Sequence, residues 1–150
     1  MPMFIRALIL VLLALPPTTT FAGPAEDANA VVDRWAAAFT ANDADAVVKL
    51  YTPDAILLGT VSPIIAEGTA PIRDYFKGLP ESGNKVVIGD RRSVVLSEGA
   101  VLATGFYEFT SIRDGKPTPT PARFTMIVVK RDGEWLIAHH HSSRRPPPAQ

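Results

Sequence analysis

The chain has 150 residues, which allows one ordinary domain, and its 15 basic residues balance its 15 acidic ones. This balance provides no basic field for nucleic acid, so a DNA or RNA partner is not expected. With 47% apolar and 20% charged residues, the chain is predicted to fold rather than remain disordered. Because it has no cysteine, disulfides, thiol nucleophiles and cysteine-bound metals are excluded.

The first 22 residues have the pattern of a secretory signal peptide. Arg6 is the only charge, residues 7–15 are an unbroken apolar run, and small residues lead to Ala22. Since a membrane-spanning helix takes about 20 apolar residues, this run is too short for a permanent anchor. We predict cleavage after Ala22, a periplasmic or secreted product, and no membrane association of the mature chain.

Helical patterns come first along the chain. Residues 26–41 carry large apolar side chains at helical spacing, and residues 44–51 form a second, shorter amphipathic segment. A short strand over residues 55–58 and a loop over residues 59–68 follow. Residues 69–77 predict a third helix, with a proline in its first turn.

After residue 84 the apolar pattern changes to a period of two. Segments 85–96, 101–112, 122–130 and 134–142 are separated by turn residues, as in three consecutive hairpins. The predicted fold class is α+β, with a curved antiparallel sheet wrapped on the long N-terminal helix. We assign the domain to residues 23–143 and an extended proline-rich tail to residues 144–150.

The last two strands are apolar on both faces. Phe124, Met126 and Val128 alternate with Ile127 and Val129. A sheet of this kind needs covering on both sides, and one helix layer covers only one. The sequence therefore predicts a homodimer or a larger homo-oligomer that associates through the outer face of the sheet.

Three histidines follow one another in the final strand. Strand alternation directs His139 and His141 to one face, and His140 to the other. His139 and His141 could supply two ligands to a metal, but no spacing identifies a third, so we expect no metal site. A general base is a second reading, and hydrogen-bonded structural histidines are the leading one.

Other candidates lie among aromatic residues. Glu108 and Tyr107 are adjacent in a predicted strand and could serve acid–base chemistry, although Glu108 could equally face solvent. Arg73 lies on the third helix, where it either reaches solvent or turns inward to a carboxylate or ligand. No dinucleotide-binding fingerprint is present, so we expect no cofactor.

These segments resemble a known family. The chain is similar to the association (hub) domain of calcium/calmodulin-dependent protein kinase II and its stand-alone bacterial relatives of the SgcJ type, within the nuclear transport factor 2-like, or SnoaL-like, superfamily of cone-shaped α+β barrels. The resemblance rests on three stretches: Glu67-Gly68 with Arg73, Tyr75 and Phe76; residues 43–55, which include Leu50-Tyr51-Thr52-Pro53-Asp54-Ala55; and residues 132–143, from Asp132-Gly133-Glu134-Trp135 to the histidines.

The resemblance implies a small-molecule pocket. It implies that Arg73 turns inward and that Tyr75, His139 and His141 contact a ligand, possibly a carboxylate, with Arg123 near the mouth. In the hub domain, further pocket arginines stand where this chain has Phe106, Met126 and Ser142.

Three functions stay open. The first is a non-catalytic oligomeric binding protein, and the chain is too short to hold a kinase domain. The second is a cofactor-independent isomerase, cyclase or dehydratase with His139, His141, Glu108 or Tyr107 as acid–base groups. The third is a purely structural association domain.

Overall fold

The computed structural model describes residues 23–147; the predicted signal peptide lies outside the described residues. Helix α1 (Pro24–Thr40) begins with a proline and has Glu26 and Asp27 in its first turn, where the helix dipole favours negative charge. Helix α2 (Ala44–Lys49) is capped by Asp43, whose carboxylate accepts a hydrogen bond from the Ala46 backbone N–H. Helix α3 spans Thr69–Phe76. All three predicted helices are confirmed to within about two residues.

The strands are β1 (Tyr51–Leu58), β2 (Ile65–Glu67), β3 (Lys85–Ser97), β4 (Ala100–Arg113), β5 (Lys116–Arg131) and β6 (Glu134–Arg144). The three predicted hairpins are present. Two of them turn at Asp-Gly pairs, Asp114-Gly115 and Asp132-Gly133, whose positive φ angles suit the twist of a tight hairpin.

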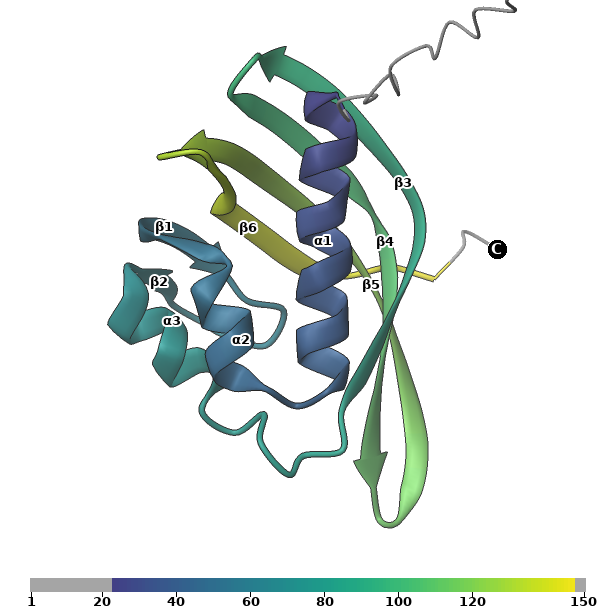
Figure 1. Cartoon of the computed structure of the whole chain (residues 1–150). Coiled ribbons are helices and arrows are strands. Elements are labelled where there is room, and N and C mark those ends of the chain that lie inside the picture. Colours follow the sequence, from purple (N-terminus) through teal and green to yellow (C-terminus); the bar gives the residue numbers. More distant parts are fainter. Residues whose placement is uncertain (1–22, 148–150) are drawn as a thin grey trace, which may run out of the picture.

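The strand order is β2-β1-β6-β5-β4-β3, so the curved sheet is open rather than a closed barrel. One pair, β1 with β6, is parallel, and all the others are antiparallel, which corrects the expectation of a wholly antiparallel sheet. Figure 1 shows α1 lying across one face of the sheet, with β3 and β4 bending around it and α2 and α3 beside β1 and β2. The α+β class and the wrapping on the long helix are confirmed.

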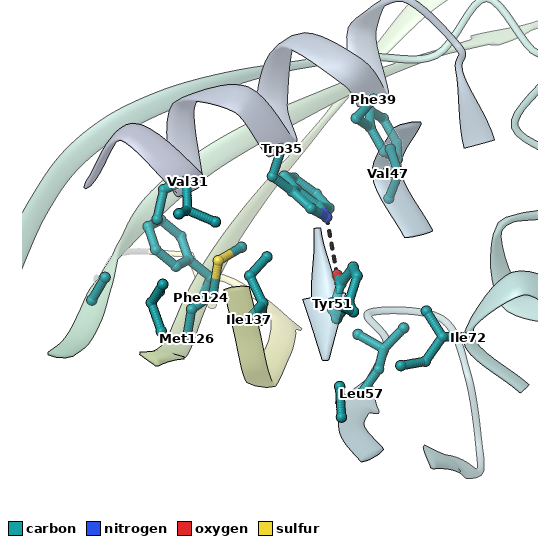
Figure 2. Close-up of a cluster of buried hydrophobic side chains, with 14 of the residues drawn as sticks. Val31, Trp35, Phe39, Val47, Tyr51, Leu57, Ile72, Phe124, Met126 and Ile137 are labelled. Atoms are coloured by element: carbon teal, nitrogen blue, oxygen red, sulfur yellow. Dashed lines mark hydrogen bonds between the residues drawn. The ribbon is translucent and has the colours of Figure 1, made fainter. Parts of the chain in front are cut away.

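The core forms between α1 and this inner face of the sheet. Figure 2 shows Val31 and Trp35 of α1 directed toward Phe124, Met126 and Ile137 of the strands. All five of these side chains are buried. The apolar stripe read from the sequence therefore packs as predicted, and Trp35, Phe39 and Trp135 are all core residues.

Two strands are longer than the sequence predicts. Strand β1 begins at Tyr51 instead of residue 55, and β5 begins at Lys116 instead of residue 122. The early part of β5 contains Pro117, Pro119 and Pro121, all on one side of the strand. The pairing of β5 with β6 ends at Ala122 and Arg144. The three prolines, which have no N–H, lie beyond this end of the pairing, at an edge of the sheet where no N–H donor is needed.

Candidate functional site

A cavity of about 290 Å³ lies between α1, α3 and the inner face of the sheet. Its wall is largely aromatic, with Trp35, Phe39, Tyr75, Phe76, Tyr107 and Phe109. Polar groups gather at His140, Ser142 and Thr60, and two arginines, Arg113 and Arg144, also line it. No Asp or Glu lines the cavity in the part of the chain that the structure describes. This composition is typical of a small-molecule site.

A chain of hydrogen bonds runs from the core into this cavity. The Trp35 Nε1–H donates to the Tyr51 hydroxyl at 3.0 Å, drawn as a dashed line in Figure 2. The Tyr51 hydroxyl is 2.8 Å from His140 Nδ1, and His140 Nε2 is 3.4 Å from the Tyr107 hydroxyl.

The chain continues toward the β1–β2 loop. The Tyr107 hydroxyl donates to Ser142 Oγ, which also hydrogen-bonds to Thr60 Oγ1. Six side chains from α1, three strands and a loop are thereby joined. Each of the six side chains has at least one partner in this network, which orders the cavity wall.

Burial keeps this network uncharged. Loss of solvent lowers the pKa of His140 to about 3, with smaller contributions from His139 and His141. Burial likewise raises the pKa of Tyr51 and of Tyr107 well above the ordinary value for a phenol. At neutral pH the inner end of the cavity therefore presents neutral hydrogen-bonding groups.

A β-bulge decides which histidine enters the cavity. Strand β6 points Trp135 and Ile137 inward, so simple alternation would bring His139 and His141 inward as well. Ala138 is instead an extra residue, because Ile127 of β5 pairs with His139 while Val128 pairs with Ile137. The bulge reverses the alternation, and His140 is buried on the inner face.

His139 and His141 lie outside the cavity, which corrects their predicted place as its ligand-contacting residues. His139 is half-buried on the outer face, where burial and the neighbouring His141 lower its pKa. His141 is exposed and lines a separate groove. Sequence analysis assigned His140 to the opposite face from the candidates, and nothing in the sequence marks Ala138 as a bulge.

That separate groove, on the outer face of β3–β6, is called here the outer groove. It has a volume of about 450 Å³, and its lining includes Arg92, Arg123 and His141. Arg123 donates to Ser143 Oγ at 3.1 Å instead of standing at the mouth of the inner cavity. Phe106 lines the outer groove too, with the Arg145 guanidinium 4.0 Å from the centre of its ring.

The predicted arginine of the cavity also lies elsewhere. Arg73 is at the surface, with its side chain 52% exposed and ion-paired to Asp45 of α2. An arginine on the outward side of a short helix finds a solvated carboxylate at little cost, so nothing draws it inward. The arginines that do line the cavity, Arg113 and Arg144, were not singled out by sequence analysis, which assigned Arg144 to the tail.

The remaining candidates divide between the two faces. Glu108 is exposed on the outer face, one residue from Tyr107, which points inward and is buried. Tyr75 lines the cavity, where burial raises its pKa. Its ring lies so close to Gly59 that a Cβ there would overlap it and force the ring to move.

Among residues 23–147, no three His, Asp or Glu side chains are grouped to hold a metal ion. No helix in this same range has the length and apolar content to cross a membrane.

Solved structures similar to this one include proteins named as association or hub domains and a protein named for an enzyme. A protein from Xanthomonas campestris, provisionally named a calcium/calmodulin-dependent protein kinase II association domain, is 35% identical; the match covers 89% of this chain and 99% of that one, with a TM-score of 0.75. The S. rosetta calcium/calmodulin-dependent protein kinase II hub is 21% identical over 84% of this chain and all of that one, with a TM-score of 0.72.

A third structure is named for an enzyme. A Novosphingobium aromaticivorans protein, provisionally named a scytalone dehydratase, is 12% identical over 80% of this chain and 83% of that one, with a TM-score of 0.73. Likeness at this level of identity shows a shared fold alone. A search of curated proteins finds no match.

The profile of one family covers most of the chain. The SnoaL-like domain matches residues 28–148, which contain all three helices except the start of α1 and every strand of the sheet. Together with the 35% identity to the Xanthomonas protein, this match confirms the resemblance read from the sequence. The chain belongs to the SnoaL-like domain family, with the nuclear transport factor 2-like fold.

Proposed function

We propose that this protein is an exported, homo-oligomeric, non-catalytic protein that binds a small molecule in its inner cavity. The observation that carries the proposal is the cavity itself: an aromatic wall, a neutral hydrogen-bonded inner end and two arginines without acidic lining residues. A carboxylate is the ligand group that such arginines suit, because the guanidinium offers paired donors.

The pKa values of the buried side chains in the cavity favour binding over catalysis. An imidazole with a pKa of about 3 is a weak base at neutral pH, and a phenol with a raised pKa is a weak acid. Neither Tyr107 nor His140 is therefore poised for proton transfer at neutral pH.

Oligomer formation is supported by the outer face of the sheet. Exposed apolar side chains there include Val94, Leu96 and Phe106. Two structures with the same fold are named as association or hub domains. Export is proposed on the signal-peptide pattern of residues 1–22 alone.

A cavity-narrowing variant tests the binding function. Gly78 lines the cavity, and apart from its neighbours in the chain no residue has an atom within 4 Å of the place where its Cβ would stand. A thermal-shift screen of small carboxylates should find compounds that stabilise the wild type and fail to stabilise Gly78→Leu, while the two proteins have similar melting temperatures without ligand. Absence of any stabilising compound contradicts the proposal.

A cofactor-independent isomerase, cyclase or dehydratase is the second candidate. It is favoured by the hydrogen-bonded Tyr107 and His140 in the cavity, and by a shared fold with proteins named as dehydratases. Hydrogen–deuterium exchange beside the carbonyl of a bound ketone, followed by NMR, tests it: exchange that depends on His140 supports an enzyme.

A further inference from the structure

The hydrogen bonds around His140 have a direction that follows from the chemistry of Trp35. An indole N–H only donates, so the Tyr51 oxygen accepts from it. The single hydroxyl proton of Tyr51 then has one acceptor among the described residues, Nδ1 of His140 at 2.8 Å. If Nδ1 carried the proton instead, the buried Tyr51 hydroxyl proton would be left without a partner.

This direction fixes the tautomer of His140. A neutral imidazole carries one proton, and since Nδ1 accepts, the proton is on Nε2. His140 is neutral at physiological pH because of its burial. Its Nε2 atom is therefore a hydrogen-bond donor.

The Nε2 edge of the ring is the one that faces the cavity. Tyr107, beside Nε2, lines the cavity, whereas Tyr51, beside Nδ1, does not. The Nε2–Tyr107 distance of 3.4 Å is long for a hydrogen bond, so this donor is poorly satisfied within the protein. A ligand oxygen that accepts a hydrogen bond would complete it.

The two arginines lie at the opposite end of the same cavity. Strands β4 and β6 run in the same direction on either side of β5, and Arg113 follows Tyr107 along β4 as Arg144 follows His140 along β6. Among residues 23–147, neither arginine forms an ion pair with a carboxylate. One end of the cavity is thus neutral and donating, and the other is cationic.

We infer that the cavity selects an apolar-bodied ligand with two different oxygen groups, an uncharged acceptor such as a ketone at His140 Nε2 and a carboxylate at Arg113 and Arg144. This rests on the proposed binding function and assigns the class of ligand. A carboxylate at the inner end would be desolvated with no cation to balance it, so the two groups are not interchangeable.

Three probes of nearly equal size test the inference with the full chain. β-Benzoylpropionate carries both groups, butyrophenone lacks the carboxylate, and phenylbutyrate lacks the ketone. Calorimetric titration should show β-benzoylpropionate binding at least tenfold more tightly than either of the others. In Arg144→Gln and in Arg113→Gln, the affinity for β-benzoylpropionate should fall toward that for butyrophenone. The affinity for butyrophenone itself should stay unchanged. Equal binding of phenylbutyrate and β-benzoylpropionate overturns the inference.

A second measurement tests the tautomer without any substitution in the network. The ¹⁵N NMR spectrum of His140 should show a protonated Nε2 and an unprotonated Nδ1 at neutral pH, and a protonated Nδ1 overturns the inference. If none of the three probes binds while another compound does, the ligand class is wrong and the binding function stands. If no compound of any class binds, both are contradicted.

Discussion

The inner and outer faces of the same strands have opposite chemistry. Tyr107 and His140 on the inner face are buried and neutral, and both belong to one hydrogen-bonded network. Phe106 and His141, the residues next to them in the sequence, line the outer groove together with three arginines. A one-residue step along a strand therefore separates a site for an uncharged group from a charged surface. The function of a residue in this sheet depends first on which face it occupies.

Truncating Tyr107 on the inner face and Phe106 on the outer face should give the largest difference between the two faces. Tyr107 is 3% exposed and Phe106 is 38% exposed. Tyr107→Ala should lower the free energy of unfolding by about 3–5 kcal/mol, since it leaves a cavity and breaks two hydrogen bonds. Phe106→Ala should lower it by less than about 1 kcal/mol in dilute solution. Urea denaturation measures both.

The same pair also probes the outer face as an interface. If a second subunit covers Phe106, the loss caused by Phe106→Ala should grow with protein concentration. Equal losses for the two variants at low concentration would contradict the division into a buried and an exposed face.

Acidification should weaken the fold through His140. Its pKa is about 3 in the folded protein and 6.5 in a free chain, so between these values only the unfolded state takes up the proton. Stability should be full above pH 6.5 and fall by up to about 1.4 kcal/mol per pH unit below it. Denaturation at a series of pH values measures this slope.

The histidines of the two faces supply the control for that slope. His140→Gln should flatten it, although the variant is less stable overall. His141→Gln removes only a minor cause of the lowered pKa of His140, so most of the slope should remain. An unchanged slope in His140→Gln would show that another group is responsible.

A glycine on β4 tests how closely the strands approach at the outer groove. A Cβ on Gly105 would overlap the backbone carbonyl of Asp90 and crowd the Arg91 backbone. Gly105→Ala should therefore destabilise the fold by about 1–3 kcal/mol. Gly99→Ala, whose Cβ would make only an ordinary contact 3.9 Å from Lys130, should leave the melting temperature nearly unchanged. The β3–β4 register shifts between Ile88 and Arg91 of β3. Equal melting temperatures would mean that β3 moves easily away from Gly105 at this shift.

Most of the fold was predictable because it follows from periodicity. The apolar stripe of α1 and the Asp-Gly turns at 114–115 and 132–133 are local signals that tertiary packing does not override. The parallel pairing of β1 with β6 joins residues more than 80 positions apart, as Tyr51 with Ile137, and no local pattern encodes it.

The site was predicted only in part. Tyr107 and Tyr75 line the cavity, but the histidine that enters it is His140, because the Ala138 bulge shifts the alternation by one residue. A bulge is specified by the register of the neighbouring strand and not by the bulged residue. Arg144 was assigned to the tail because the prolines that follow it hide the end of β6.

The smallest expected effect is that of substituting Arg73, which lies at the surface and not in the cavity. Arg73 was expected in the cavity and is instead exposed beside Asp45, on α2, whose side chain is 67% exposed. A solvated ion pair contributes little to stability, so Arg73→Lys should change the free energy of unfolding by less than about 1 kcal/mol. It should also leave the affinity for β-benzoylpropionate unchanged, whereas Arg144→Gln weakens it. Calorimetric titration of the two variants side by side makes the comparison, and a large loss of affinity in Arg73→Lys would mean that Arg73 reaches the ligand after all.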